Sequence, residues 1–178
     1  MAGSGRDERA WVQGAQAGSV PDLEALFRHH WPRAYRAAYL VVDDAAAAED
    51  IAQEAFLAAL RSLDRFDRRR PFGPWLHRIV VNRSIDWARA RSLRRETASD
   101  VILDWPDPAA GPERADPPAL AGHLADLPLE QRAVIVLRYL LEYTPGEIAR
   151  LLELPRGTVN SRLRRGLDRL AETLKEEP

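Results

Sequence analysis

Residues 98–120 place the strongest limit on how this chain can fold. The segment contains five prolines, one glycine and five acidic residues. Proline removes a backbone donor and its ring clashes with the preceding helical turn, so such a segment cannot sustain a long helix. We therefore predict a linker at residues 96–118, which separates an N-terminal domain at 1–95 from a C-terminal domain at 119–178.

Both flanks of this linker have the apolar spacing of amphipathic helices. Apolar residues recur three and four positions apart, and no alternating strand pattern of useful length is present. The pattern predicts an all-α fold in which an N-terminal helical bundle and a C-terminal helix-turn-helix are joined by the acidic, proline-rich linker. The expected helices cover residues 7–17, 21–41, 45–65, 74–93, 129–142, 145–152 and 156–175.

The net charge of −1 is a cancellation of opposite blocks. Residues 61–95 contain 11 basic and 3 acidic side chains, whereas residues 96–130 contain 1 and 8. A net charge of +8 over a short segment is typical of a surface that meets a polyanion. The chain has no cysteine, which excludes disulfides, thiolate zinc sites and cysteine nucleophiles. Because no signal sequence or long apolar run occurs, we expect a cytoplasmic protein.

The C-terminal segment has the pattern of a helix-turn-helix. Thr144 and Glu147 have the spacing of a capping box, with Pro145 at the first helical position. The sequence Leu-Pro-Arg-Gly at 154–157 then ends one helix and begins another.

The second of these helices divides into two faces. The face expected to meet the core carries Val159, Leu163, Leu167, Leu170 and Leu174. The opposite face carries hydroxyls and guanidinium groups, which suit base edges and phosphates in a major groove. Its residues are Thr158, Ser161, Arg162, Arg165 and Arg169. Arg156, at the start of the same helix, is a further candidate for contact with DNA. Gly166 lies inside this helix, where it either costs about 1 kcal/mol or allows another backbone or side chain to approach closely.

The expected helix at 45–65 also has two distinct faces. Ile51, Ala55, Phe56, Ala59 and Leu63 form its apolar stripe. Asp50, Gln53, Glu54 and Leu57 lie on the other side. An exposed leucine among acidic and amide groups indicates a protein partner, although a solvated face with one stray leucine explains the spacing equally well.

The basic block combines arginines with aromatic residues. Arginines can follow the phosphates of single-stranded DNA while aromatic rings stack on its unpaired bases. The candidate residues are Arg68, Arg69, Arg70, Phe72, Trp75, Arg78, Arg83 and Arg89. The alternative is that the aromatic rings belong to the core, which the neighbouring Leu76, Ile79 and Val80 favour for Trp75. Residues 71–74 are expected to form a rigid turn before the next helix.

In this order the segments resemble a bacterial RNA polymerase sigma factor of the extracytoplasmic-function (ECF) type. The resemblance rests on AEDIAQEAFLAAL, RPFGPWLHRIVVNRSIDWARARSLRR and LPLEQRAVIVLRYLLEYTPGEIARLLELPRGTVNSRLRRGLDRL. It implies that the face at Asp50, Gln53, Glu54 and Leu57 docks on the core polymerase. It implies that the turn at 66–74 and the start of the next helix hold the unpaired −10 strand and a flipped base. It further implies that the helix at 156–175 reads the −35 element, and that an anti-sigma protein is a partner.

Three other classes of function fit the sequence less well. An autonomous helix-turn-helix regulator would leave the basic and aromatic block unexplained. A helical adaptor would explain the face at Asp50 but not the arginine-rich helices. An enzyme is not expected, because the four histidines are scattered along the sequence and no metal, phosphate-loop or nucleophile motif is present. We therefore expect neither a cofactor nor a metal, and no insertion into a membrane.

Overall fold

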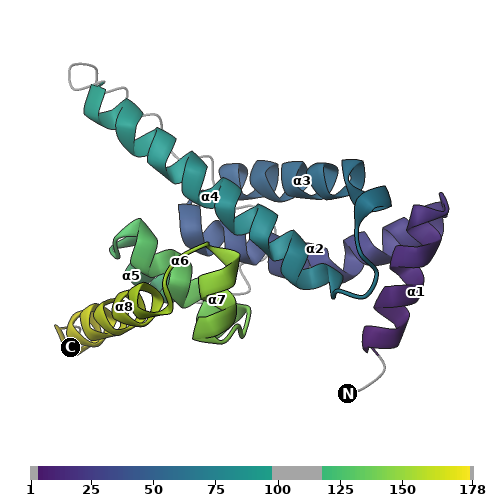
Figure 1. The fold of residues 1–178 in the computed structure, drawn as a ribbon. Coiled ribbons are helices and arrows are strands. Elements are labelled where there is room, and N and C mark those ends of the chain that lie inside the picture. The colour runs from purple at the N-terminus through teal and green to yellow at the C-terminus, as the bar shows by residue number, and fades with distance from the viewer. Residues whose placement is uncertain (1–3, 98–117, 177–178) are drawn as a thin grey trace.

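The computed structural model describes residues 4–97 and 118–176, and all regular elements within these ranges are helical (Figure 1). The predicted linker at 96–118 lies almost wholly outside the described residues. The all-α prediction is confirmed. Within the described ranges, no helix is long and apolar enough to cross a membrane.

Four helices build the N-terminal module. They are α1 (Ser4–Gln16), α2 (Val20–Val42), α3 (Ala45–Arg61) and α4 (Phe72–Thr97), and a short 3-10 turn, η1 (Leu63–Arg65), follows α3. Helices α2, α3 and α4 pack against one another, and α1 crosses the end of the bundle beside α2 (Figure 1). The expected helix at 45–65 is shorter than predicted, because Ser62 ends it and the backbone then tightens into η1.

Local sequence explains where α2 and α3 begin. The Ser19 side chain accepts a hydrogen bond from the Asp22 amide, and Pro21 occupies the first turn of α2. The Asp44 carboxylate accepts one from the Ala47 amide at 3.0 Å. Both caps satisfy backbone donors that the first helical turn leaves without a partner. Small side chains then let α2 and α3 approach closely, since alanines occupy much of their contact. These fully buried alanines are Ala34, Ala37, Ala38, Ala48, Ala52, Ala55 and Ala59.

The C-terminal module contains α5 (Pro118–Ala125), α6 (Leu129–Ile135), η2 (Val136–Leu140), α7 (Pro145–Leu151) and α8 (Arg156–Glu176). Helix α5 was not predicted as a separate element. The expected helix at 129–142 is divided, because η2 is a π turn in which the Leu141 amide donates to the Val136 carbonyl. The turn ends at Leu140, and Glu142, two residues further on, has a positive φ of 62°.

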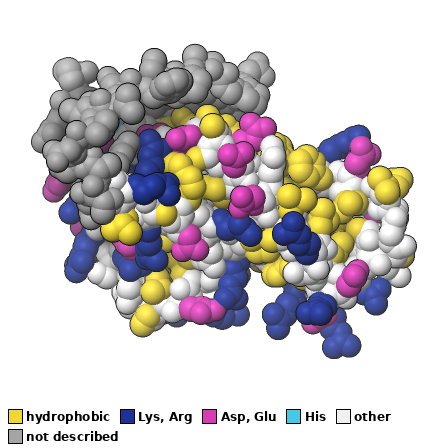
Figure 2. Space-filling view, turned by 90° about the horizontal axis from the view of Figure 1, so that it is seen from above, with side chains coloured by type: hydrophobic (Ala, Val, Ile, Leu, Met, Phe, Trp, Pro, Cys, Tyr) yellow, Lys and Arg dark blue, Asp and Glu magenta, His cyan; other side chains and the backbone are white. Residues whose placement is uncertain are grey.

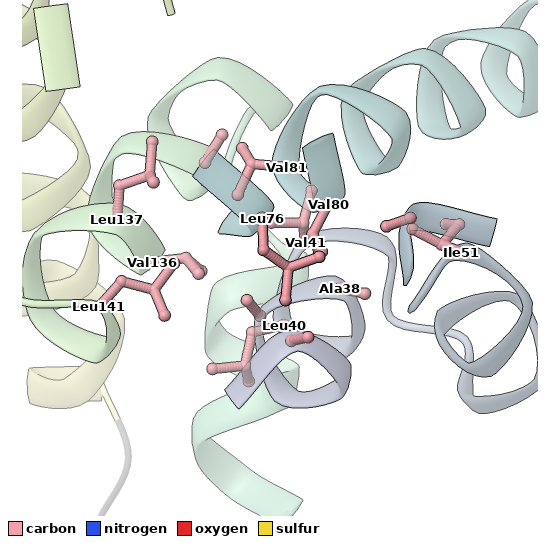
Figure 3. Packing of buried hydrophobic residues seen from close by; sticks show 14 of the residues in the cluster. Ala38, Leu40, Val41, Ile51, Leu76, Val80, Val81, Val136, Leu137 and Leu141 are labelled. Atoms are coloured by element: carbon pink, nitrogen blue, oxygen red, sulfur yellow. The ribbon is translucent and has the colours of Figure 1, made fainter. Parts of the chain in front are cut away.

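The two modules share one continuous hydrophobic cluster. Figure 3 shows Val41 of α2 and Leu76 and Val80 of α4 close to one another, with Val136 and Leu137 of η2 on the neighbouring side. All five side chains are at most 2% exposed. A polar contact adds to this boundary, because the Arg132 guanidinium of α6 donates to the Val41 carbonyl at 2.8 Å. The modules therefore meet through a dry, packed interface.

Candidate polymerase and DNA interfaces

The predicted polymerase-binding residues of α3 share one exposed face of the helix, as their spacing predicts. Asp50, Gln53, Glu54 and Leu57 are all exposed, and Leu57 is 51% exposed. The opposite stripe is buried against α2 and α4, and its buried members are Ile51, Ala55, Phe56 and Ala59. Glu54 is not free, because its Oε2 atom lies 2.5 Å from Nη1 of Arg83 on α4.

The aromatic residues beside the three consecutive arginines form a cluster of their own. Phe72 is 2% exposed, and its ring lies 5.8 Å from that of Phe66 and 5.6 Å from that of Trp75. Trp75 is half-buried and stacks on Phe66 at 4.6 Å. The expectation that Phe72 offers a stacking face to an unpaired base does not fit this burial. Its ring packs beneath the loop instead. This agrees with the alternative prediction that these aromatic rings belong to the core.

The loop lies earlier in the chain than the predicted turn. Helix α4 begins at Phe72, so Gly73 and Pro74 belong to its first turn, and the predicted turn at 71–74 is corrected to a loop at 66–71. Proline is tolerated at such a position because the first turn needs no intrahelical donor. Arg68, Arg69 and Arg70 are exposed along this loop. Among the described residues, no ion pair engages their side chains.

The three arginines predicted on α4 are held by carboxylates. Arg78 pairs with Glu153, and Arg83 pairs with Glu54. Arg89 Nη2 lies 3.5 Å from Oε1 of Glu130. In the coloured part of Figure 2, basic and acidic side chains are interspersed on the face seen from above. Two of these carboxylates, Glu130 and Glu153, come from the C-terminal module, so that module covers part of the predicted −10 surface.

The capping box predicted at the start of α7 is present. The Glu147 amide donates to Thr144 Oγ1 at 3.3 Å, and the Thr144 amide donates to Glu147 Oε2 at 2.8 Å. The hydrogen bonds from Thr144 lower the pKa of the exposed Glu147 carboxyl below its ordinary value. The turn to α8 contains Glu153 with φ of 55°, a conformation that favours glycine. At this position Glu153 also reaches Arg78.

Helix α8 leaves half of the six predicted DNA-binding residues exposed. Arg156, Arg165 and Arg169 are exposed, while Thr158, Ser161 and Arg162 are half-buried. The core stripe differs from the prediction, because Leu167 is 40% and Leu174 57% exposed. Gly166, rather than these two leucines, packs against α6. A Cβ atom added at Gly166 would lie 2.6 Å from Cδ1 of Ile135. Of the two explanations for Gly166, the structure supports the close approach.

Two segments of the chain match family models, namely "Sigma-70 region 2" at residues 26–94 and "Sigma-70, region 4" at residues 120–170. The ECF RNA polymerase sigma factor SigW of Bacillus subtilis is 34% identical over 157 residues, which cover 80% of this chain and 83% of SigW. The ECF RNA polymerase sigma factor SigM of Mycobacterium tuberculosis is 34% identical over 173 residues, covering 96% of this chain and 87% of SigM. The chain belongs to the ECF RNA polymerase sigma factors.

The fold agrees with this family. The structure of CnrH in complex with the cytosolic domain of CnrY is similar with a TM-score of 0.72 and 27% identity, and the match covers 97% of this chain and 99% of CnrH. Region 2 of this sigma factor corresponds to most of α2 together with α3 and much of α4, and region 4 corresponds to α5–α8. The chain is thus a transcription initiation factor that directs RNA polymerase to promoters.

Three polar residues of the sigma factor's buried interior were missed by sequence reasoning. Glu8 of α1, His30 of α2 and His77 of α4 come together behind the loop at 66–71, although the histidines appear scattered along the sequence. The rings of His30 and His77 lie 6.4 Å apart, and Glu8 Oε1 lies 3.2 Å from His30 Nε2. Within the described ranges no three His, Cys, Asp or Glu side chains are placed to hold a metal.

Proposed function

We propose that the two modules of this sigma factor divide promoter recognition. The N-terminal module, residues 1–95, docks on core polymerase through Asp50, Gln53, Glu54 and Leu57. The same module receives the unpaired −10 strand at the loop 66–71 and the adjoining face of α4. The C-terminal module, residues 119–178, reads the −35 element with α8, and residues 96–118 link the two.

The observation that carries this proposal is the contrast between two exposed helix faces. The face of α3 has carboxylates, an amide and an exposed leucine, which suit a protein surface rather than DNA. The predicted DNA face of α8 carries hydroxyl and guanidinium groups from Thr158 to Arg165, which suits base edges and phosphates, and acids join this side only further along the helix, at Asp168 and Glu172. Each face lies in a segment that matches its own family model.

For the −10 surface we propose Arg68, Arg69 and Arg70 as the primary contacts, since they are exposed and face no carboxylate partner in the described part of the chain. Arg78, Arg83 and Arg89 can join them only by exchanging a carboxylate for a phosphate. Trp75 offers its remaining exposed surface, and Phe72 acts by supporting the loop.

We also infer an anti-sigma partner and a cytoplasmic site of action, and no catalytic role. The resemblance to ECF sigma factors supports such a partner, and the similar structure of CnrH holds another protein's cytosolic domain.

Run-off transcription with core polymerase and a library of promoter templates tests the proposal. We expect promoter-dependent transcripts only when both the protein and core polymerase are present. A gel shift on duplex DNA without polymerase provides the contrast, because tight and specific binding there indicates an autonomous regulator. Absence of both core binding and promoter-dependent transcripts contradicts the proposal.

A further inference from the structure

Helix α1 lies outside the segment that matches region 2, yet it holds both ends of the loop that carries the three consecutive arginines. Three of its residues, Glu8, Val12 and Gln16, are spaced four apart and therefore lie along one side of the helix. Val12 is 2% exposed. The two polar side chains on either side of it make the contacts with the loop.

The side chains of Gln16 and Glu8 bind backbone groups at the two ends of the loop, where most of these groups have no partner within a helix. The Gln16 side-chain amide donates to the Leu63 carbonyl at 2.8 Å and to the Phe66 carbonyl at 3.0 Å, at the two ends of η1. The Leu63 carbonyl also accepts from the Phe66 amide at 2.9 Å. Glu8 Oε1 accepts from the amides of Phe72 and Gly73, both at 3.1 Å, where the chain enters α4. Carbonyls at the end of one helical segment and amides at the start of the next are the backbone groups that lack intrahelical partners.

The Glu8 carboxylate is itself held in place. Its Oε1 atom lies 3.2 Å from His30 Nε2, and its side chain is 16% exposed. The contact with His30 lowers the pKa of Glu8, and the amides of Gly73 and Phe72 act in the same direction against the effect of burial. Gly73 has little space around it, because an added Cβ would lie 3.2 Å from Cε1 of His30. The carboxylate is therefore ionised and fixed at neutral pH.

A pocket opens where α1 meets the loop. Glu8, Arg9 and Val12 of α1 line it together with Arg68, Arg70, Pro71 and Phe72. The Oε1 atom of Glu8 is already engaged by the amides of Phe72 and Gly73. Three guanidinium groups suit a phosphate of the unpaired strand, since arginine binds phosphate through paired hydrogen bonds. Val12 and Phe72, each 2% exposed, form the floor of the pocket and offer no stacking face. The depth and width of this pocket depend on where the loop ends are fixed, and α1 fixes both.

We propose that α1 is a working part of the −10 site: Glu8 and Gln16 are positioning residues that set the shape of the loop, and Arg9 binds a phosphate of the unpaired strand. This inference rests on the proposed function, because it assumes that the loop 66–71 receives that strand. It adds residues that precede the region 2 match to the site.

The test uses the full-length protein in complex with core polymerase. The probe is a promoter chosen by run-off transcription, with its −10 segment held unpaired by mismatches. Glu8→Ala should lower the affinity of the holoenzyme for this probe roughly tenfold, because two backbone amides lose a charged acceptor. Glu8→Gln should stay within about twofold of the unchanged protein, because its amide oxygen can still accept from both amides. Gln16→Ala should also lower the affinity of the holoenzyme for the probe.

Two controls distinguish a change in the shape of the loop from a general loss of folding or of core polymerase binding. Glu24→Ala removes an exposed glutamate of α2 that pairs with Arg28 at 3.4 Å, and it should leave probe binding unchanged. All variants should bind core polymerase normally. A holoenzyme carrying Glu8→Ala should also discriminate less between probes that differ at one unpaired base, and Glu8→Gln should restore that discrimination.

Arg9→Ala supplies an independent measurement. Losing one phosphate contact should reduce the slope of log affinity against log salt concentration by about 1. The proposal is overturned if Glu8→Ala binds and discriminates like the unchanged protein, if Glu8→Gln is as defective as Glu8→Ala, or if Arg9→Ala leaves the salt slope unchanged. Failure of the proposed function itself has a different signature, because the unchanged protein would then give no promoter-dependent transcript from any template.

Discussion

The Nδ1 atom of His77 on α4 lies 2.7 Å from the hydroxyl oxygen of Tyr143, which precedes α7, and this hydrogen bond joins the two modules. His77 is 5% exposed and Tyr143 is half-buried. Burial raises the pKa of Tyr143, so its hydroxyl stays protonated. Burial lowers the pKa of His77 to about 4, so its ring is neutral at physiological pH. The contact is therefore a hydrogen bond between two neutral groups.

Tyr143→Phe should destabilise the contact between the modules. The change leaves His77 Nδ1 buried without its partner, which we expect to lower the free energy of unfolding by about 1–3 kcal/mol. Urea denaturation followed by circular dichroism measures this loss. The matched control is Tyr139→Phe, because Tyr139 is 58% exposed and should change stability by less than about 0.5 kcal/mol. Equal losses for the two variants would show that the hydroxyl of Tyr143 contributes nothing specific.

His77 should also make the folded protein sensitive to mild acid. Its pKa falls from 6.5 to about 4 on folding, mainly through burial and also through the charges of His30 and Arg33. Since the unfolded chain takes up the proton first, this stability is present above pH 6.5 and is lost as the pH falls toward 4. The full loss is about 3 kcal/mol. His77→Gln should flatten the curve of unfolding free energy against pH between 6.5 and 5, where Glu8 stays ionised. His29→Gln, at an exposed ring, should flatten it much less.

Charge reversal on α3 should prevent association with core polymerase. We expect Asp50→Arg combined with Glu54→Arg to abolish binding in a pull-down with purified core enzyme. The fold should survive, because the exposed pair of Glu54 with Arg83 contributes at most about 1 kcal/mol. Glu24→Arg on α2 reverses one charge outside the α3 face and should bind normally. A double variant that still binds core polymerase would place the docking surface elsewhere.

Two arginines of α8 should carry −35 recognition. Arg162→Ala and Arg165→Ala should each weaken binding of the holoenzyme to the −35 element by about 1–3 kcal/mol if they contact base edges. Arg164→Ala is the control on the same helix, because Arg164 is exposed but lies away from the hydroxyl and guanidinium face. Promoter competition assays measure all three. A larger effect at Arg164 than at the other two would show that α8 enters the groove with a different face.

Gly166 should not tolerate a side chain. Alanine favours a helix by about 1 kcal/mol over glycine. At 166, however, the added Cβ meets Ile135 Cδ1 at 2.6 Å and Gln131 Cβ at 3.3 Å. Since overpacking costs about 1–3 kcal/mol, Gly166→Ala should lower the melting temperature. Gly157→Ala, at a position with open space around it, should not. Adding Ile135→Val removes the Cδ1 atom and should recover part of the loss.

The helices and their faces could largely be predicted because they depend on local spacing. The capping box at Thr144 and the buried stripe at Ile51, Ala55, Phe56 and Ala59 were found as predicted. Helix α5 was missed because its sequence begins in proline-rich chain. Its stability depends on Ala121 and Leu124, which become buried only when the module packs.

The missed site residues depend on contacts between distant parts of the chain. Gln16 meets residues 47 and 50 positions away, and Glu8 meets residues 64 and 65 positions away. No spacing within α1 distinguishes these side chains from ordinary polar ones. The exposure of Leu167 and Leu174 has a similar cause. Helix α6 packs on the side of α8 that carries Gly166, so these two leucines remain in solvent. The exposed α3 face and the α8 arginines needed only helical periodicity, and their functional roles remain predictions.

The dry boundary between the modules has a calorimetric consequence. Val41, Leu76 and Val80 lie on one side of it and Val136 and Leu137 on the other, all in one cluster. Any step that separates the modules brings water onto this apolar surface, which raises the heat capacity of the protein. Formation of a protein interface lowers it. The temperature dependence of the binding enthalpy with core polymerase therefore reports whether the modules part when the holoenzyme assembles, with no label on either protein.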